Sequence, residues 1–182
     1  DEAGLPILYV SHALPEVARL ANSIVVIEEG RVLRSAPAAD VMADPNLSAI
    51  LGLRDAGSLI SARLVAQEAD GLTRLETSGG PLFLPHLSAP VGAVVRLRIP
   101  AQDVMISLNR PEAISALNIL TVTIDSVTHS AGSGAVLSLR LGDEKLLARL
   151  TQRSVEALQL RPGLQVFAVL KSVALAQGDF GP

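Results

Sequence analysis

Apolar residues in the last two thirds of the chain occur in short runs that turn residues separate. These runs have the length of β-strands and lie at residues 59–65, 72–75, 82–84, 93–99, 104–108, 119–127, 135–141, 145–150 and 164–173. Clusters rich in glycine, proline and serine lie between them, for example at 78–81 and 161–163, and favour turns. Many short strands at such spacing are typical of antiparallel barrels and sandwiches. The pattern therefore predicts a mainly β region.

This β region repeats itself. Gly92 and Gly163 lie 71 positions apart, and each precedes a strand-like run. A further short apolar segment follows each run, at 103–106 and at 172–175. The order of the elements repeats together with the local pattern, so we predict two small OB-like antiparallel β-barrels in tandem. A barrel of this size has a thin core, and sharing strands would stabilise both copies.

The first 56 residues have a different, α/β pattern. We predict a strand, a helix that begins near Pro15, a hairpin that turns at Glu28-Glu29-Gly30, and two short helices. In chain order these elements lie at residues 6–11, 14–22, 23–27 with 31–34, 37–42 and 45–51. The formal charge changes from −4 over residues 1–56 to +1 over residues 57–182, at a turn-like cluster spanning 55–58. We place the domain boundary there.

The composition excludes several classes of site. The chain has 182 residues, 49% of them hydrophobic, and no cysteine, which rules out disulfides and thiolate metal sites. The net charge is −3 and aromatic residues make up 2%, so neither a basic nucleic-acid surface nor a base-stacking platform is expected. The three histidines lack metal-ligand spacing, and we predict no metal site. No signal peptide or membrane span is visible, and the chain looks like a piece of a longer protein.

Residues 5–34 resemble the end of the nucleotide-binding domain of ABC transporters. The resemblance consists of the run Leu8-Tyr9-Val10-Ser11-His12, the helix pattern at 16–21 and the hairpin pattern at 24–32. In that family the histidine after the strand contacts the γ-phosphate of ATP and helps to position the attacking water. The resemblance therefore implies that His12 is a catalytic residue of the full-length protein.

The other parts of an ABC ATPase are missing from this chain. It has no G-x-x-x-x-G-K-S/T loop, no signature motif, and no acidic Mg²⁺ ligand followed by a catalytic glutamate, and phosphoryl transfer depends on these parts. We therefore expect residues 1–56 to be a C-terminal fragment of such a domain. The full-length protein would use ATP and Mg²⁺, whereas this fragment would require no cofactor and would not hydrolyse ATP.

Residues 57–182 resemble the duplicated molybdate- and tungstate-binding barrels, of TOBE or MOP type, at the end of molybdate-importer ATPases. Three patterns carry the resemblance: Ser-Ala-Leu-Asn at 115–118, Thr-x-x-Ser at 151–154 and Lys-Ser at 171–172. In that family these positions surround a tetrahedral oxyanion between barrels. The resemblance thus assigns oxyanion binding to Ser115, Thr151, Ser154, Lys171 and Ser172. Hydroxyl donors and a lysine suit a dianion.

One position departs from the family pattern. Leu117 stands where related storage and regulator proteins have an arginine, so one cation is lost. Arg153, next to Ser154, is a candidate substitute. Lys171 gains weight because the chain has only two lysines against 13 arginines. We expect an oxyanion affinity below that of the family members that carry the arginine.

Together the two resemblances predict the regulatory end of an ABC-type molybdate importer ATPase, which couples ATP hydrolysis to molybdate uptake. They imply a homodimer at the cytoplasmic face of the bacterial plasma membrane, together with transmembrane permease subunits and, indirectly, a periplasmic or extracellular molybdate-binding protein. No nucleic-acid partner is implied.

Three alternatives differ from this interpretation. Appended barrels also occur in sulfate and sugar importers, but the pattern at 151–154 with Lys171 favours molybdate. A free-standing molybdate-binding or storage protein would have no need for the switch histidine in residues 5–34. A transcriptional regulator would need a basic DNA-reading helix, which the charge of −4 over residues 1–56 disfavours.

Overall fold

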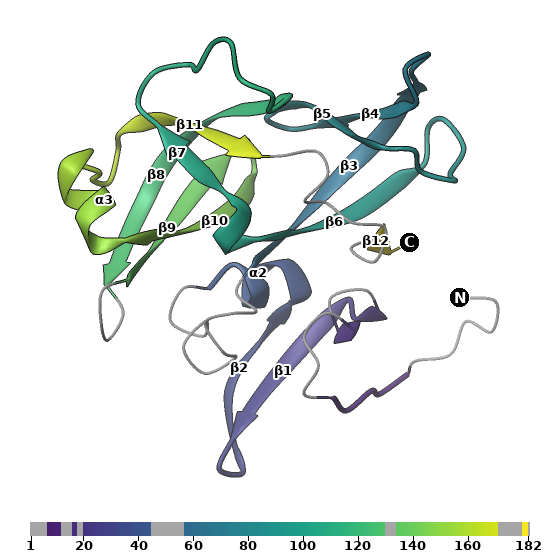
Figure 1. Cartoon of the computed structure of the whole chain (residues 1–182). Helices are drawn as coiled ribbons and strands as arrows, with labels where there is room; N and C mark the ends of the chain where they lie inside the picture. The colour runs from purple at the N-terminus through teal and green to yellow at the C-terminus, as the bar shows by residue number, and fades with distance from the viewer. Residues whose placement is uncertain are drawn as a thin grey trace.

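The computed structural model describes residues 7–11, 16–17, 20–44, 57–129, 134–170 and 180–181 (Figure 1). The strands are β1 (Ser23–Glu28), β2 (Arg31–Pro37), β3 (Gly57–Gln67), β4 (Leu72–Thr77), β5 (Gly80–Pro85), β6 (Val94–Pro100), β7 (Met105–Ser107), β8 (Asn118–His129), β9 (Gly134–Leu141), β10 (Glu144–Thr151), β11 (Gln165–Leu170) and β12 (Phe180–Gly181). The helical elements are α2 (Ala38–Met42), the 3₁₀ turn η2 (Ala101–Asp103) and α3 (Gln152–Ala157). The predicted mainly β fold is confirmed.

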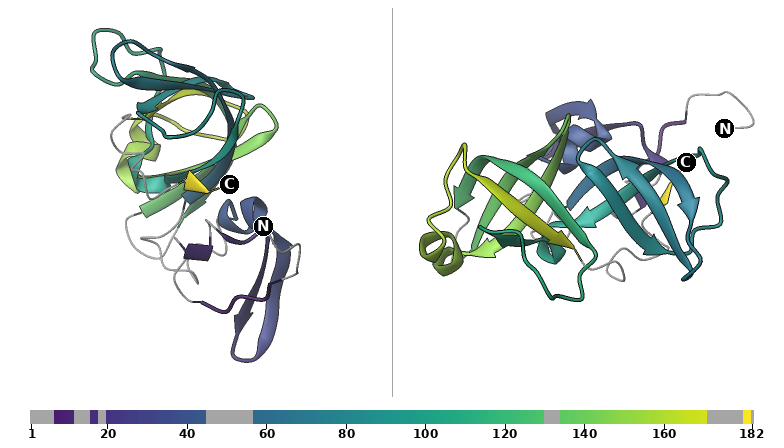
Figure 2. Two further views of the ribbon diagram at one scale, coloured as in Figure 1. Left: turned by 90° about the vertical axis from the view of Figure 1, so that its right-hand side faces the viewer. Right: turned by 90° about the horizontal axis from the view of Figure 1, so that it is seen from above.

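Two five-stranded antiparallel sheets make up the β region. One has the order β12-β6-β3-β4-β5 and is called the first barrel here; the other has the order β10-β9-β8-β11-β7 and is called the second barrel. Seen from above, the two sheets curl side by side as a pair of small OB-like barrels (Figure 2). Each predicted strand between residues 59 and 170 is present, with bounds shifted by a few residues at most.

The two barrels exchange strands. β7 follows β6 in the chain but pairs with β11 of the second barrel, where Met105 lies opposite Val169. β12 comes after the second barrel in the chain but pairs with β6 of the first, where Phe180 lies opposite Leu97. Each barrel is therefore completed by a strand from the other half of the repeat. This exchange agrees with the expectation that the two barrels share strands.

The repeat is also visible in the hydrogen bonds. The Gly92 N–H donates to the Leu64 carbonyl oxygen at 2.8 Å, and the Gly163 N–H donates to the Ile124 carbonyl oxygen at 2.7 Å. Both glycines have positive φ angles, +93° and +83°, a conformation that favours glycine. Leu64 and Ile124 each directly precede a β-bulge. The structure thus confirms that the elements around Gly92 and Gly163 are equivalent.

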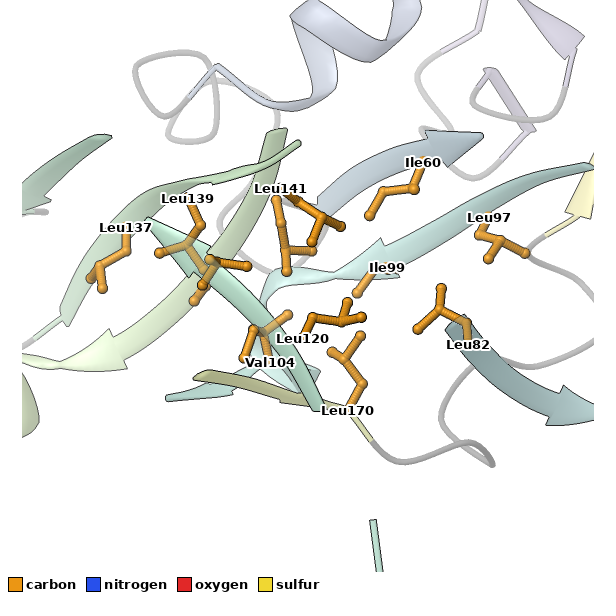
Figure 3. Packing of buried hydrophobic residues seen from close by; sticks show 14 of the residues in the cluster. Ile60, Leu82, Leu97, Ile99, Val104, Leu120, Leu137, Leu139, Leu141 and Leu170 are labelled. Atoms are coloured by element: carbon orange, nitrogen blue, oxygen red, sulfur yellow. The ribbon is translucent and has the colours of Figure 1, made fainter. Parts of the chain in front are cut away.

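A single hydrophobic core runs through both barrels (Figure 3). It brings together Leu97 and Ile99 of β6 with Leu120 of β8, Leu139 of β9 and Leu170 of β11, all of them buried. Burial of one such side chain contributes about 1.5–3 kcal/mol relative to its exposure. Because side chains of both barrels share this core, neither barrel can lose its packing without exposing the other.

The described residues between 7 and 44, called the N-terminal segment here, lie against the first barrel. Residues 16, 17 and 20 are helical, in agreement with the predicted helix, and β1 and β2 form the predicted hairpin. The predicted helix at 37–42 is present as α2, between the hairpin and the barrels (Figure 1). The other predicted helix, at 45–51, lies outside the described residues.

Two predictions were wrong. Residues 7–11 form no strand, and Ile7, Leu8 and Val10 are exposed. A strand needs a hydrogen-bonded neighbour, and none of the described strands pairs with this run. Gly57 and Ser58, which were assigned to a turn, are the first residues of β3. Ser58 is fully buried, because it contacts the second barrel.

Candidate functional site

Two of the predicted oxyanion residues lie together at the end of β10. Thr151 is the last residue of this strand and caps α3, and its Oγ1 accepts a hydrogen bond from the Ser154 N–H at 3.1 Å. The two hydroxyl oxygens are 2.8 Å apart. Thr151 is exposed and Ser154 is half-buried. Both hydroxyls therefore lie next to each other at the surface, where an anion can reach them.

A second hydrogen-bonded chain runs beside this pair. His129 Nδ1 lies 2.6 Å from Gln152 Oε1, and Gln152 Nε2 donates to Glu156 Oε1 at 2.8 Å. These contacts tie the end of β8 to α3, which carries Ser154. No recognisable motif in the sequence marks these residues as a site, since His129 only follows a strand-like run. The i, i+4 spacing of Gln152 and Glu156 was the available signal.

Ser115 lies at the opposite end of the second barrel. It is exposed and precedes the first residue of β8, Asn118. Thr151, in contrast, lies near the last residue of β8, His129. Thr151 pairs with Gly134 of β9, and the next residue, Ala135, pairs with His129. Twelve residues of strand span roughly 36 Å. One copy of the chain therefore does not bring the Ser115 hydroxyl to Thr151, and Figure 1 shows α3 at the far end of β8 from β5.

The remaining predicted site residues, His12, Lys171 and Ser172, lie outside the described residues. The strand that leads to Lys171 is β11, whose last residue, Leu170, pairs with Asn118. The end of β11 therefore lies beside the segment that carries Ser115 and Leu117. Leu117 is 53% exposed, so the leucine that replaces the family's arginine lies at the surface of this end.

The chain is similar to known proteins in sequence and in fold. Residues 114–177 match the TOBE domain family. The chain is 39% identical over 176 residues, 96% of its length, to the molybdenum import ATP-binding protein ModC of Rhizobium etli. It is 43% identical over 176 residues to ModC of Rhizobium meliloti and 41% identical over 181 residues to ModC of Methylococcus capsulatus.

The chain is a ModC-like C-terminal region that contains a TOBE domain. It spans about half the length of the ModC proteins that it matches, 49% for that of Rhizobium etli. Among solved structures, it is similar to the cytoplasmic molybdate-binding protein ModG with molybdate bound, with a TM-score of 0.56 and 23% identity. This similarity covers 63% of this chain and 90% of ModG, and it supports the fold of paired barrels.

Only one half of the repeat in this ModC-like region carries the oxyanion pattern. The pairing of β3 with β6 and of β8 with β11 makes Ile99 equivalent to Leu170. Pro100 and Ala101 thus stand where the second half has Lys171 and Ser172. Proline and alanine side chains offer neither a charge nor a hydroxyl. The residue pattern expected for an oxyanion site thus includes a lysine and a hydroxyl at these positions in the TOBE half and not in the first half.

The carboxylate of Glu144, the first residue of β10, bonds to the first barrel. Glu144 Oε1 accepts the Ser61 N–H at 2.6 Å, and Glu144 Oε2 accepts the Ser78 hydroxyl at 3.3 Å. Burial raises the pKa of Glu144, and these two hydrogen bonds lower it by a smaller amount. Both donors come from the first barrel, so β10 carries Thr151 at one end and a cross-barrel contact at the other.

Two kinds of feature are absent from the described residues. No three histidine, aspartate or glutamate side chains in that part of the chain gather as metal ligands do. None of its helices combines the length and the apolar character that a bilayer span requires.

Proposed function

We propose that this chain is the regulatory end of the ATP-binding subunit of a molybdate importer. The observation that carries the proposal is the similarity over 96% of the chain to proteins named molybdenum import ATP-binding protein. In this proposal the full-length protein is a homodimer at the cytoplasmic face of the bacterial plasma membrane. It works with transmembrane permease subunits, and a periplasmic or extracellular molybdate-binding protein delivers the anion to them.

The oxyanion would bind between two copies of the chain. Ser115 and Thr151 lie at opposite ends of the second barrel, and a symmetric pair can bring the Ser115 end of one copy to the Thr151 end of its partner. Thr151 Oγ1 accepts the Ser154 N–H and lies 2.8 Å from Ser154 Oγ. One of these two hydroxyls can donate to the other, and the hydrogen of the second then remains available for an anion oxygen. Lys171 and Ser172 would add the cation and further donors.

The expected ligand is a tetrahedral dianion. Molybdate and tungstate carry two charges and four acceptor oxygens, so one lysine with several neutral donors is a plausible minimum set. Sulfate has the same charge in a smaller shell, and a site sized for molybdate would bind it less tightly. Leu117 supplies no cation, which lowers the expected affinity for each of these anions.

ATP and Mg²⁺ would belong to the part of the subunit that this chain does not contain. The chain has no loop that cradles phosphates, so its residues do not form the nucleotide site by themselves. Bound there, ATP supplies the phosphoryl group whose transfer to water drives transport. His12 would contribute to that site by positioning the attacking water, as the resemblance to ABC ATPases implies.

A mixing experiment tests whether the site is shared between copies. Thr151→Asp keeps a good helix cap but places a carboxylate where the anion would bind, and Ser115→Ala removes the hydroxyl at the other end. We expect each variant alone to lose molybdate binding in titration calorimetry. In a symmetric dimer, an equal mixture has heterodimers with one intact site each, which restores about a quarter of the sites.

The outcomes of this experiment separate the possible arrangements. Recovery in the mixture supports a site made by two copies. If neither variant weakens binding, or the mixture recovers nothing while the unmodified chain binds well, the shared site is wrong. Molybdate, tungstate and sulfate are titrated in parallel, and equal binding of all three would favour a sulfate importer or a general anion site instead.

A further inference from the structure

An arginine of the first barrel holds the end of the helix in the N-terminal segment. Arg96 of β6 donates from Nη1 to the Ala21 carbonyl oxygen at 3.1 Å and from Nη2 to Asn22 Oδ1 at 2.8 Å. Ala21 closes the last helical turn, because its N–H donates to the Val17 carbonyl at 2.8 Å. Carbonyls at a helix end lack partners within the helix, and a guanidinium satisfies them well.

The same point of the N-terminal segment is tied to α2. The Asn22 carbonyl accepts the Ala38 N–H at 2.9 Å, so one residue contacts Arg96 through its side chain and α2 through its backbone. Ala38 and Met42 of α2 pack on Leu59 of β3. Among the described residues, the contact between segment and barrel thus includes one small apolar patch and one charged fork.

A pocket that is partly open to solvent adjoins this contact. It has a volume of about 150 Å³ and is lined by residues of the N-terminal segment and of β3 and β6. Its lining residues are Asn22, Pro37, Ala38, Ala39, Leu59, Ser61 and Arg96. The Arg96 fork lies at the edge of this pocket and, together with the packing of α2 on Leu59, fixes the segment on the barrel.

The fork also lies next to the cross-barrel contact of β10. Arg96 is directly opposite Ser61 in the pairing of β6 with β3, and the Ser61 N–H donates to Glu144 at 2.6 Å. Glu144 is the first residue of β10 and Thr151 is the last. Seven steps along a strand span roughly 23 Å. One continuous strand thus joins the Thr151 end of the second barrel to the residue facing Arg96.

We propose that Arg96 is the positioning residue that couples oxyanion binding by the barrels to Ala21 and Asn22, at the end of the helix that follows His12 in the sequence. This inference rests on the function proposed above. A ligand that draws two copies together at Thr151 displaces β10, and Glu144 and Ser61 pass the displacement to the strand pair that holds Arg96. The fork then moves Ala21 and Asn22, the end of the helix that follows His12. Without the fork, a displacement of β6 would be transmitted less well to Ala21 and Asn22.

The test uses the full-length subunit assembled with its permease. Molybdate affinity is measured by calorimetry, and ATP hydrolysis is measured with and without molybdate. For Arg96→Leu we expect an affinity within about twofold of the unmodified protein, while the molybdate-dependent change in hydrolysis falls at least about fivefold. Asn22→Ala, which removes one acceptor of the fork from an exposed position, should reduce the same change. Arg96→Lys retains one donor group and should recover part of it.

Arg74→Leu is the matched control. Arg74 lies on β4 of the same barrel and makes a surface ion pair with Glu68 at 3.8 Å, away from the N-terminal segment. This variant should keep both the affinity and the response. If Arg96→Leu and Asn22→Ala bind molybdate and keep the full response, the inference is wrong. If the unmodified protein binds no molybdate, the proposed function fails, and the coupling with it.

Discussion

The side chain of Asn118 clamps the backbone of Phe83 across the two barrels. Asn118 Oδ1 accepts the Phe83 N–H at 2.7 Å, and Asn118 Nδ2 donates to the Phe83 carbonyl at 3.0 Å. The equivalent position in the first half of the repeat is Ser58, whose Oγ accepts the Leu147 N–H at 2.7 Å. The first strand of each half therefore bonds to the last hairpin strand of the other half, and both side chains are fully buried.

Removal of the clamp should destabilise the whole β region. Asn118→Ala leaves the Phe83 N–H and carbonyl without this partner, and a buried polar group that loses its hydrogen bond costs about 1–3 kcal/mol. We expect the free energy of unfolding in urea to fall by about 2 kcal/mol or more. Ser58→Ala, which removes one bond instead of two, should cost less. Asn109→Ala, at an exposed position, is the control and should change stability by less than about 0.5 kcal/mol.

Glu144 should make the stability depend on pH. Burial raises its pKa in the folded protein, so the folded state favours the protonated carboxyl. The contribution of this group is fully present below its unfolded pKa and is lost as the pH rises through its folded pKa. Glu144→Gln, which does not titrate, should therefore gain stability relative to the unmodified chain as the pH rises from about 4 through the raised pKa of Glu144. Urea unfolding at several pH values measures this difference in stability, with Glu76→Gln, at an exposed position of β4, as the control. A difference that shrinks with rising pH would contradict the assignment.

The Thr151 cap should be separable from anion binding. Thr151→Ala removes the acceptor for the Ser154 N–H and should cost about 1 kcal/mol of stability. Thr151→Asp keeps an acceptor and should cost less, although it repels an oxyanion. Thermal melts in buffer without anions compare the two variants. Should the alanine variant be the more stable of the two, the capping role would be wrong.

His12 should act in the full-length ATPase and not in this chain. Replacement by alanine in the full-length protein is expected to lower kcat by roughly 100-fold, while ATP affinity stays nearly unchanged, as for a group that acts mainly in the transition state. Steady-state hydrolysis with a parallel ATP titration separates the two quantities. The present chain, which lacks the phosphate loop, should give no saturable heat with ATP and Mg²⁺. Normal turnover of His12→Ala would remove the catalytic assignment.

Much of the fold was predictable because it depends on local pattern. The alternation of buried and less buried positions in β8 appears in the sequence as the apolar residues Leu120, Val122 and Ile124 with polar residues between them. Gly92 and Gly163 identified the repeat, since a positive φ in a turn before a strand favours glycine. The sequence also indicated that strands would be shared, but not that β7 and β12 are the strands exchanged.

What the sequence did not show depends on contacts between distant residues. Ser58 follows glycine, as turn residues often do, and its burial results from Leu147, 89 positions later. The helix α3 has six residues, too few for a helical apolar period to stand out. The run at residues 7–11 has the composition of a strand, but a strand requires a partner, and the chain spans only about half of its ModC relatives.

Titration of molybdate into the purified chain tests the central claim most directly. Because the residues of the proposed oxyanion site occur once per chain, we predict a saturable heat of binding with one molybdate per chain. Sulfate should bind more weakly. Thr151→Asp and Lys171→Ala should each abolish this heat, and Arg74→Leu should leave it unchanged. Absence of saturable binding of both molybdate and tungstate, or binding that survives in Thr151→Asp and Lys171→Ala, would contradict the account.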